Sequence, residues 1–345
     1  MLKIIKYIFY SPVDILLLLI GIGKFRKNKV NSTFSYKSML RLYFIYGDII
    51  LKFVNSLTKE NINNFEKKIT HKSKNITKIC KNIHEDGFYV KKNFLDEVEI
   101  EELKKLIYNY EYKLRLTDKN ISSKYTHQKY KSKFDPINPK AVLYEFDSNF
   151  LINQKVIQKI LLKDEILEIG KKYFGSSAFL DHVSLSITAN YNHTPDSNAA
   201  QLYHYDLDRP NWLKFLTYVN DVNYLNGPHC FLKETHKYYA IPFKMRSKGY
   251  VRFSDDDKDL KKFKINEKII TGKAGTSIIE STKGFHKGEV VKSGYRILLN
   301  IQINSSMFGS PYKVAKFENI SDDLKKKFLE KKEFFKYSTN LLEVI

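Results

Sequence analysis

Residues 275–303 read GTSIIESTKGFHKGEVVKSGYRILLNIQI, and this stretch decides the fold class. It holds three short apolar runs that are separated by glycine-containing turns. Runs of this length and composition are typical of β-strands and too short for helices. We therefore predict strands at 276–280, 285–291 and 295–303.

Similar runs precede this stretch. They predict strands at 179–190, 200–206, 213–220 and 228–233, with turn residues between them. No long helix falls between consecutive strands, which argues against a doubly wound parallel sheet. Many short strands with few intervening helices indicate a mainly β protein with flanking helices, of the sandwich or jelly-roll type.

The 345 residues are enough for one large domain with an appendage. We expect residues 1–82 to form a helical, basic N-terminal region and residues 83–318 to form the β domain. Within that domain, residues 242–270 are polar and weakly periodic, so an insertion over one mouth of the barrel is expected there. Residues 319–345 should end the chain as a helix.

Helical spacing of apolar residues predicts three further helices. They cover 36–58, the segment that follows an N-cap at Asp96, and about 153–173. A lysine- and asparagine-rich connector is expected up to about residue 82, followed by a short strand at 88–90.

The formal net charge is +21, and residues 1–84 carry 16 Lys and Arg against four acids. Such an excess suits an anionic membrane surface or nucleic acid, or it is spread over solvated faces without a partner. No nucleic-acid-binding motif stands out, so nucleic acid ranks last. The only cysteines are Cys80 and Cys230, which fits a reducing compartment, and we expect a cytoplasmic protein.

The first 29 residues are the one candidate membrane element. The uninterrupted apolar run from Ile15 to Gly23 has nine residues, against the roughly 20 that span a bilayer. A longer span would include Asp14, and both flanks are basic. Residues 1–29 are therefore expected to lie as an interfacial helix on the inner face of the cytoplasmic membrane. A buried helix that packs on the main domain is the alternative.

Two residues of the predicted strand at 200–206 could bind a metal. Side chains at i and i+2 of a strand point to the same side, so His204 and Asp206 converge while the neighbouring tyrosines face away. A histidine and a carboxylate supply two of the three protein ligands of a facial triad. Taken alone, the pair is better explained as a hydrogen-bonded structural pair, because His-x-Asp occurs often by chance. His286 is the candidate for the third ligand.

Ten residues after His286, Arg296 lies on the predicted strand 295–303. Apolar residues alternate there with Arg296, Asn300 and Gln302, so the arginine points to the polar side. A guanidinium in a pocket can bind a carboxylate through two hydrogen bonds. Taken alone, a solvent-facing arginine on a half-exposed strand is the alternative.

In combination, these residues resemble a known family. His204, Asp206, His286 and Arg296 have the order and spacing of Fe(II)/2-oxoglutarate-dependent dioxygenases. EDGFYVKKNFL (85–95) and NGPHCFLKETHK (226–237) are similar to two stretches of the phytanoyl-CoA dioxygenase family. In the second stretch, Glu-Thr-His stands where Gly-Ser-His is usual. The resemblance covers about residues 84–308.

The resemblance implies a double-stranded β-helix in which His204, Asp206 and His286 hold iron and Arg296 binds the distal carboxylate of 2-oxoglutarate. With O2, such an enzyme would hydroxylate a small-molecule, lipid-linked or carbohydrate substrate. Halogenating relatives lack the carboxylate ligand, so Asp206 favours hydroxylation. The alternative is a non-catalytic jelly-roll protein that binds a ligand at the membrane surface.

Other residues rank lower as site candidates. Basic residues of the 242–270 insertion would suit an anionic substrate: Lys244, Arg246, Lys248 and Arg252. Residues that could line the pocket or its mouth are Asp208, Lys214, Tyr218 and Lys287, whereas His229 is expected to be a strand or turn residue. Residues expected to be structural are His236, Thr276 and Ser277.

Overall fold

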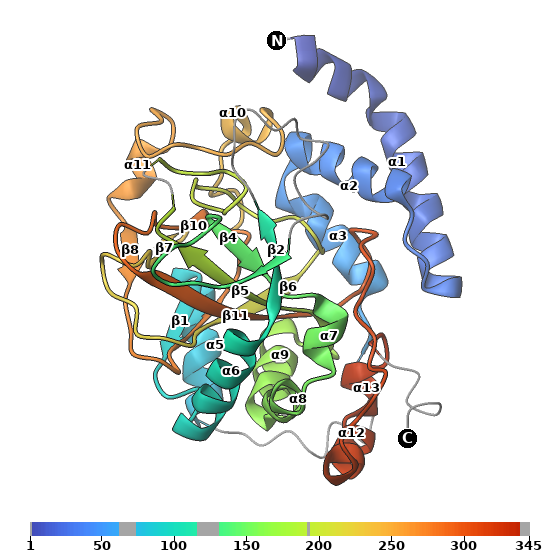
Figure 1. Ribbon diagram of the computed structural model, residues 1–345. Helices are drawn as coiled ribbons and strands as arrows, with labels where there is room; N and C mark the ends of the chain where they lie inside the picture. The colour runs from blue at the N-terminus through green and yellow to red at the C-terminus, as the bar shows by residue number, and fades with distance from the viewer. Residues whose placement is uncertain (1, 62–73, 116–130, 192–193, 339–345) are drawn as a thin grey trace.

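The computed structural model describes residues 2–61, 74–115, 131–191 and 194–338 (Figure 1). Its strands form two sheets, in the orders β1-β9-β6-β11-β5-β4-β2-β3 and β10-β7-β8. The strands of the larger sheet are β1 (Phe88–Lys91), β2 (Glu111–Arg115), β3 (Lys131–Lys133), β4 (Leu143–Glu145), β5 (Phe179–Ala189), β6 (Trp212–Tyr218), β9 (Ser277–Glu280) and β11 (Tyr295–Asn304). Those of the smaller sheet are β7 (His229–Leu232), β8 (Glu267–Ile270) and β10 (His286–Gly288).

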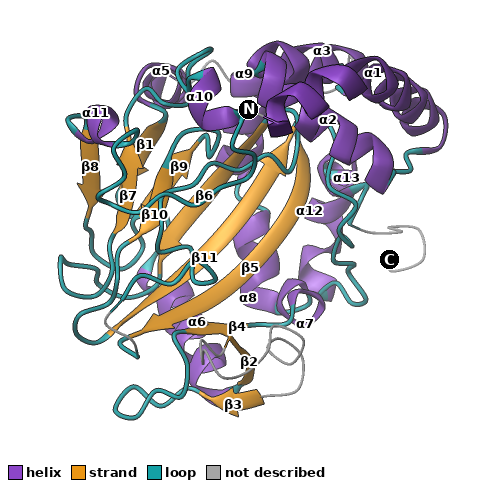
Figure 2. Ribbon diagram, turned by 90° about the horizontal axis from the view of Figure 1, so that it is seen from above, coloured by secondary structure: helices purple, strands orange, loops and turns teal. Residues whose placement is uncertain are grey.

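The long strands β5 and β11 pair side by side in the middle of the larger sheet (Figure 2). Ile297, Leu299 and Ile301 of β11 are buried in the main core, together with apolar residues of the helices. The residues that alternate with them, including Arg296 and Asn300, face the other side of the sheet, because side chains alternate along a strand.

A second apolar cluster lies between the two sheets. Leu216 and Tyr218 of β6 meet Phe231 of β7 and Ile270 of β8 there. All paired strands are antiparallel. Two antiparallel sheets that share an interior form a jelly roll, so the predicted mainly β, double-stranded β-helix fold with flanking helices is confirmed.

Helices cover the outer face of the larger sheet (Figure 1). They are α5 (Lys74–Asp86), α6 (Glu97–Asn109), α7 (Ser148–Ile152), α8 (Lys155–Leu161) and α9 (Asp164–Phe174). The predicted N-cap of α6 is confirmed. The Asp96 carboxylate accepts a hydrogen bond from the Glu99 backbone N–H at 2.8 Å. The Glu99 carboxylate accepts one from the Asp96 backbone N–H at 3.0 Å, and the two bonds together form a capping box.

Three N-terminal helices, α1 (Leu2–Asn28), α2 (Thr33–Tyr46) and α3 (Asp48–Thr58), lie together beside the barrel (Figure 1). Their buried residues share one cluster with Tyr203, Tyr205 and Leu207. Asp14 of α1 is buried and accepts hydrogen bonds from Ser38 and Arg41 of α2. Its charge is therefore compensated inside the protein.

Among the described residues, no helix has the length and apolar character that a bilayer crossing requires. Membrane contact through residues 1–29 stays a prediction, and so do the domain boundaries at 82/83 and 318/319. The remaining helices are α10 (Phe243–Arg246), α11 (Lys261–Lys264), η1 (Asp322–Leu324), α12 (Lys325–Glu330) and α13 (Lys332–Phe335).

Two predicted helices are each divided in two. The helix at 36–58 is α2 and α3, because Gly47 between them has φ of 71° and the Arg246 guanidinium lies against it. That guanidinium donates to the Tyr43 carbonyl at the end of α2. The helix at 153–173 is α8 and α9, which are separated at Leu162 and Lys163.

Other predicted elements differ in extent. The segment 200–206 is no regular strand, since only Tyr203 and His204 form isolated bridges, and Ala200 has φ of 55°. The predicted connector contains α5, and its residues 62–73 lie outside the described part of the chain. The insertion ends in β8, which pairs with β7. Strands β2, β3 and β4 were not predicted, because each is three to five residues long.

We predict that Arg209→Met destabilises the fold strongly. Arg209 and Asp181 are each 1% exposed and form two hydrogen bonds, at 2.8 and 3.0 Å. Removing the cation would leave a buried carboxylate uncompensated, at a cost of about 3–5 kcal/mol in the free energy of unfolding. Urea unfolding at neutral pH measures this, with Lys273→Met on an exposed side chain as control. A loss below about 1 kcal/mol would contradict it.

This pair also predicts acid sensitivity. Burial raises the pKa of Asp181, but the charge and hydrogen bonds of Arg209 outweigh it and hold the pKa at about 2. Its folded-state pKa thus lies below its unfolded value of about 4. The corresponding stability is present above pH 4 and is lost as the pH falls toward 2.

Candidate functional site

His204, Asp206 and His286 form a buried cluster, and none of them is more than 6% exposed. Two backbone hydrogen bonds join His204 to His286. The His204 N–H donates to the His286 carbonyl at 3.1 Å, and the His286 N–H donates to the His204 carbonyl at 2.9 Å. This pairing places the ring centroids 4.2 Å apart. The Asp206 carboxylate lies 3.9 Å from Nε2 of His204 and 3.6 Å from Nε2 of His286. The three candidates from the sequence are thus brought together.

Both imidazoles are held in one orientation. Nδ1 of His204 lies 2.9 Å from the Leu202 carbonyl, and Nδ1 of His286 lies 3.0 Å from the Gly284 carbonyl. A carbonyl only accepts, so each Nδ1 carries the proton and each Nε2 keeps its lone pair. Burial lowers the pKa of both rings, which keeps them neutral. Neutral imidazoles oriented by a backbone carbonyl are the usual metal-binding form.

Asp206 is the anionic member of the cluster. Burial raises its pKa, but Lys214 and the two histidines outweigh this, and the pKa lies well below its usual range. The Lys214 ammonium is 2.6 Å from one carboxylate oxygen, and the Tyr250 hydroxyl donates to the other at 3.1 Å. Two neutral imidazole nitrogens and one carboxylate are the donor set of non-haem Fe(II) facial triads, so these residues fit iron.

Arg296 lies on the interior side of β11, 5% exposed. Its guanidinium donates to the Gly227 carbonyl and, at 3.4 Å, to the Thr188 hydroxyl, while its Nε has no partner. No carboxylate in the described part of the chain forms an ion pair with it. Burial lowers its pKa, although a guanidinium remains charged. A buried cation without an anion is what a site for a ligand carboxylate requires.

Gly288 makes room for this guanidinium. A Cβ at Gly288 would lie 2.6 and 2.8 Å from the two terminal nitrogens of Arg296, which is closer than such atoms approach. Gly288 follows His286 by two residues on β10, so the two positions are about 7 Å apart on the same face. Arg296 therefore lies within one small ligand's length of the metal donors.

Next to this face, His229 and Glu280 form a buried pair at 2.8 Å. The His229 ring centroid is 5.8 Å from that of His286. The second oxygen of Glu280 has no hydrogen-bond partner among the described residues. His229 is thus a strand residue, as expected from the sequence, and its ring forms part of the interior wall.

A second group of possible ligands, Cys230, Glu267 and Glu289, lies on the opposite side of the smaller sheet. It is already occupied by protein contacts. Lys287 pairs with Glu289 at 2.8 Å, and the Tyr203 hydroxyl donates to Glu267. Burial raises the pKa of the Cys230 thiol, which keeps it protonated and a poor ligand. This group carries no metal assignment.

The remaining candidates divide clearly. Lys287 faces away from the interior and pairs with Asp255 at 2.7 Å. Burial and then the Asp206 charge raise the pKa of Asp208 to about 6. Three other candidates form hydrogen bonds inside the protein. The Tyr218 hydroxyl donates to the Ile270 carbonyl, the Ser277 hydroxyl accepts from Thr217, and the His236 ring bonds to the His84 carbonyl.

Tyr250, which contacts Asp206, was not predicted from the sequence. Three of the four basic residues of the insertion that were expected to suit an anionic substrate are instead bound to other protein groups. Lys244 and Lys248 pair with Asp259, and Arg246 donates to two backbone carbonyls. The Arg252 guanidinium lies over the Tyr250 ring, 5.9 Å from its centroid, and one of its nitrogens is buried without a hydrogen-bond partner among the described residues. Its charge acts on His204, so it lies near the triad.

The fold is similar to those of several solved enzymes. Similar solved structures include the non-haem α-ketoglutarate-dependent epimerase SnoN from nogalamycin biosynthesis, at 11% identity and a TM-score of 0.45, covering 67% of this chain and 83% of that one. HygX from Streptomyces hygroscopicus, with nickel and 2-oxoglutarate bound, has 13% identity and a TM-score of 0.45 over 72% of this chain and 92% of its own. EctD from S. alaskensis in its apoform has 13% identity and a TM-score of 0.46, and the match covers 76% of this chain and 88% of EctD. No curated protein matches the sequence.

The family model for phytanoyl-CoA dioxygenase matches residues 83–296, a range that contains the triad and ends at Arg296. Its cofactors, Fe(II), 2-oxoglutarate and O2, are the ones that the interior donor set fits. The chain belongs to the phytanoyl-CoA dioxygenase family and is an Fe(II)- and 2-oxoglutarate-dependent enzyme of the oxygenase type.

Proposed function

We propose that this protein hydroxylates a small-molecule, lipid-linked or carbohydrate substrate, with His204, Asp206 and His286 as iron ligands. The observation that carries the proposal is the buried cluster of two neutral imidazoles and one carboxylate. Fe(II), 2-oxoglutarate and O2 together replace a substrate hydrogen by hydroxyl, with succinate and carbon dioxide as co-products. The protein supplies the positioning, and its residues divide into three tasks.

The first task is to hold the metal donors. The backbone bonds between His204 and His286 set their spacing, and the carbonyls of Leu202 and Gly284 aim each Nε2 inward. Lys214 and Tyr250 hold the Asp206 carboxylate from two sides. A carboxylate held in this position occupies the place that a halide needs, which favours hydroxylation over halogenation.

The second task is to bind the co-substrate. Arg296 would donate two parallel hydrogen bonds to the distal carboxylate of 2-oxoglutarate. Its position about 7 Å along β10 from His286 suits a five-carbon dicarboxylate whose other end reaches the metal. The Thr188 hydroxyl, 3.4 Å from the guanidinium, supports its orientation.

The third task is to recognise the substrate. Arg252 has a buried nitrogen without a partner and belongs to the insertion whose Tyr250 contacts Asp206. An unpaired cation beside the metal donors favours a substrate with an anionic group near the reacting carbon. The other basic residues of the insertion are engaged within the protein and do not support this argument.

We also propose that the enzyme works at an anionic membrane surface. Val13, Leu16 and Ile20 follow one another at helical spacing on α1 and are 53%, 58% and 47% exposed. Lys24 and Lys27 continue the same outer side and are exposed. Asp14 points inward to α2, so it does not oppose insertion of the outer face. An apolar stripe that ends in lysines matches an interfacial helix on acidic lipids.

Anaerobic addition of Fe(II) and 2-oxoglutarate should produce the weak visible charge-transfer band of the chelate. We expect no band in His204→Ala, because a ligand is lost. In Arg296→Ala the apparent Kd for 2-oxoglutarate should rise about tenfold or more, since a charged hydrogen bond contributes about 1.5–3 kcal/mol. Wild-type protein that is well folded but shows neither band nor iron binding would favour the non-catalytic binding protein.

Gly288→Ala should weaken 2-oxoglutarate binding about tenfold while leaving Fe(II) binding unchanged, because the new methyl group displaces the Arg296 guanidinium. Titration of the same band measures this. Gly23→Ala is the matched control, since its Cβ would have no atom within 4 Å. Equal affinity in Gly288→Ala and wild type would show that Arg296 is not the carboxylate site.

Leu16→Glu combined with Ile20→Glu should reduce binding to phosphatidylglycerol vesicles at least about tenfold, because burying each side chain contributes about 1.5–3 kcal/mol. Co-sedimentation measures it, with phosphatidylcholine vesicles for comparison. Leu329→Glu on α12 is the control, as Leu329 is 44% exposed. Vesicle binding that is unchanged by the double substitution, or a dimer that the substitution dissociates, would refute the membrane surface.

A further inference from the structure

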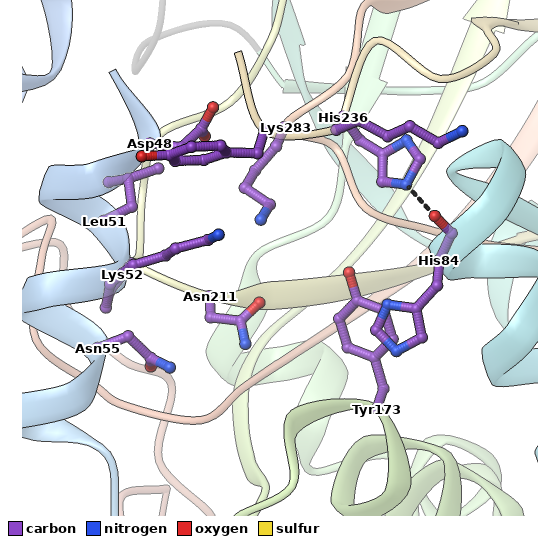
Figure 3. Close-up of a pocket in the computed structure, with 12 residues that line it drawn as sticks. Asp48, Leu51, Lys52, Asn55, His84, Tyr173, Asn211, His236 and Lys283 are labelled. Carbon is purple, nitrogen blue, oxygen red and sulfur yellow. Dashed lines mark hydrogen bonds between the residues drawn. The ribbon is translucent and has the colours of Figure 1, made fainter. Parts of the chain in front are cut away.

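A separate cavity of about 330 Å³ lies between the N-terminal helices and the barrel (Figure 3). None of the triad residues lines it. Its wall comes from α3, the ends of α5 and α9, and three loops. The lining residues are Asp48, Leu51, Lys52, Asn55, His84, Tyr173, Pro210, Asn211, His236, Lys237, Tyr238 and Lys283.

Two ammonium groups point into the middle of this cavity. Figure 3 shows the side chains of Lys52 and Lys283 directed toward the same space, with the Asn211 amide beside them. Lys283 is half-buried and has no hydrogen bond or ion pair with any described residue. The Lys52 ammonium lies 3.9 Å from the ring centroid of Tyr238. Two converging cations that form no ion pair with a carboxylate of the described residues are costly unless a ligand compensates them.

One carboxylate lines the cavity beside the two ammonium groups. The charge of Asp48 acts on Lys283 and Lys52, but no ion pair joins it to either ammonium within the described ranges, and it accepts a hydrogen bond from the Tyr239 backbone at 3.3 Å. Lys237 is paired with Glu234 at 2.9 Å. Burial lowers the pKa of His84 and brings that of His236 to about 4, so both rings are neutral. The centre of the cavity is therefore cationic.

The wall beside these cations is aromatic. The rings of His84 and Tyr173 stack with centroids 4.6 Å apart and planes 15° apart. Asn55 accepts a hydrogen bond from Ser305 through its amide oxygen at 2.6 Å, which leaves its amide hydrogens as donors. Cationic and amide donors next to an aromatic wall fit a ligand with a compact anionic end and an organic body.

We propose that this cavity binds a small molecule through a phosphate monoester group, held between Lys52 and Lys283. Lysine binds phosphate as a compact point charge, and a monoester carries close to two negative charges at neutral pH. Two ammonium groups match that charge better than they match a single carboxylate. The organic body lies against the stacked His84 and Tyr173.

The site lies directly behind the metal donors. Lys283 stands between Thr282, whose carbonyl accepts from the Asp206 backbone at 2.8 Å, and Gly284, whose carbonyl orients His286. Binding must therefore be separated from coordination of phosphate to iron. The full chain is titrated with Fe(II) and also as the His204→Ala variant, in which binding to the cavity should persist.

Isothermal titration with phenyl phosphate and with inorganic phosphate tests the proposal. We expect a Kd of about 1 mM or tighter for phenyl phosphate, weaker binding of inorganic phosphate, and at least about tenfold loss in Lys52→Met and in Lys283→Met. Lys273→Met, an exposed lysine on another loop, should bind as wild type does. Absence of binding, or equal binding in all variants, would overturn the proposal.

Thermal unfolding distinguishes a ligand-binding lysine from a structural one. In phosphate-free buffer Lys283→Met should raise the Tm, because it removes an unpaired, partly buried charge. Phenyl phosphate should raise the Tm of wild type but not of this variant. A lower Tm of Lys283→Met without ligand would assign the lysine a structural role and refute the site.

Discussion

The pair of backbone hydrogen bonds between His204 and His286 is the constraint on which the site depends. It joins two segments that are 82 residues apart in the chain and that otherwise share no regular ladder. Because the two residues are directly opposite each other, their side chains leave the backbone on the same side. The adjacent Asp206 N–H bonds to the Thr282 carbonyl, which brings the carboxylate to the same point. The donor set is thus a product of strand geometry.

The N-terminal helices support this pairing from behind. Tyr205, between the two metal-binding candidates, faces away from them and lies with its ring centroid 6.1 Å from that of Tyr43 on α2 and 5.6 Å from that of Phe285. The helices therefore cover the reverse side of the site. This accounts for the inward position of Asp14, whose hydrogen bonds to Ser38 and Arg41 fasten α1 to α2 and leave the opposite face of α1 apolar and exposed.

The side on which a residue lies could be predicted from the sequence where the backbone is extended, because side chains there alternate. His204 and Asp206 share a side although their segment forms only isolated bridges, and Arg296 lies on the polar side of β11. Contacts between distant segments could not be predicted. Tyr250 donates to Asp206, which is 44 residues away in the chain. Arg246 donates to the Tyr43 carbonyl near the end of α2, 203 residues away. The break at Gly47 could not be predicted for the same reason. The apolar periodicity continues across it, and the Arg246 guanidinium that requires a glycine there belongs to the distant insertion.

Several buried cations of this protein are paired with a carboxylate, whereas the cations that we propose to bind ligands form no ion pair with the described residues. Arg209 is matched by Asp181, Lys214 by Asp206 and Lys287 by Asp255 and Glu289. In the part of the chain that the structure describes, neither Arg296 nor Lys283 forms an ion pair with a carboxylate; Lys283 lines the cavity of about 330 Å³, and Arg296 lies on the interior side of β11. Burying a cation without a partner lowers stability, so a fold can retain it only where something else gains from the charge. We therefore place the two proposed ligand sites at these cations, whereas the total charge of +21 does not distinguish one lysine from another.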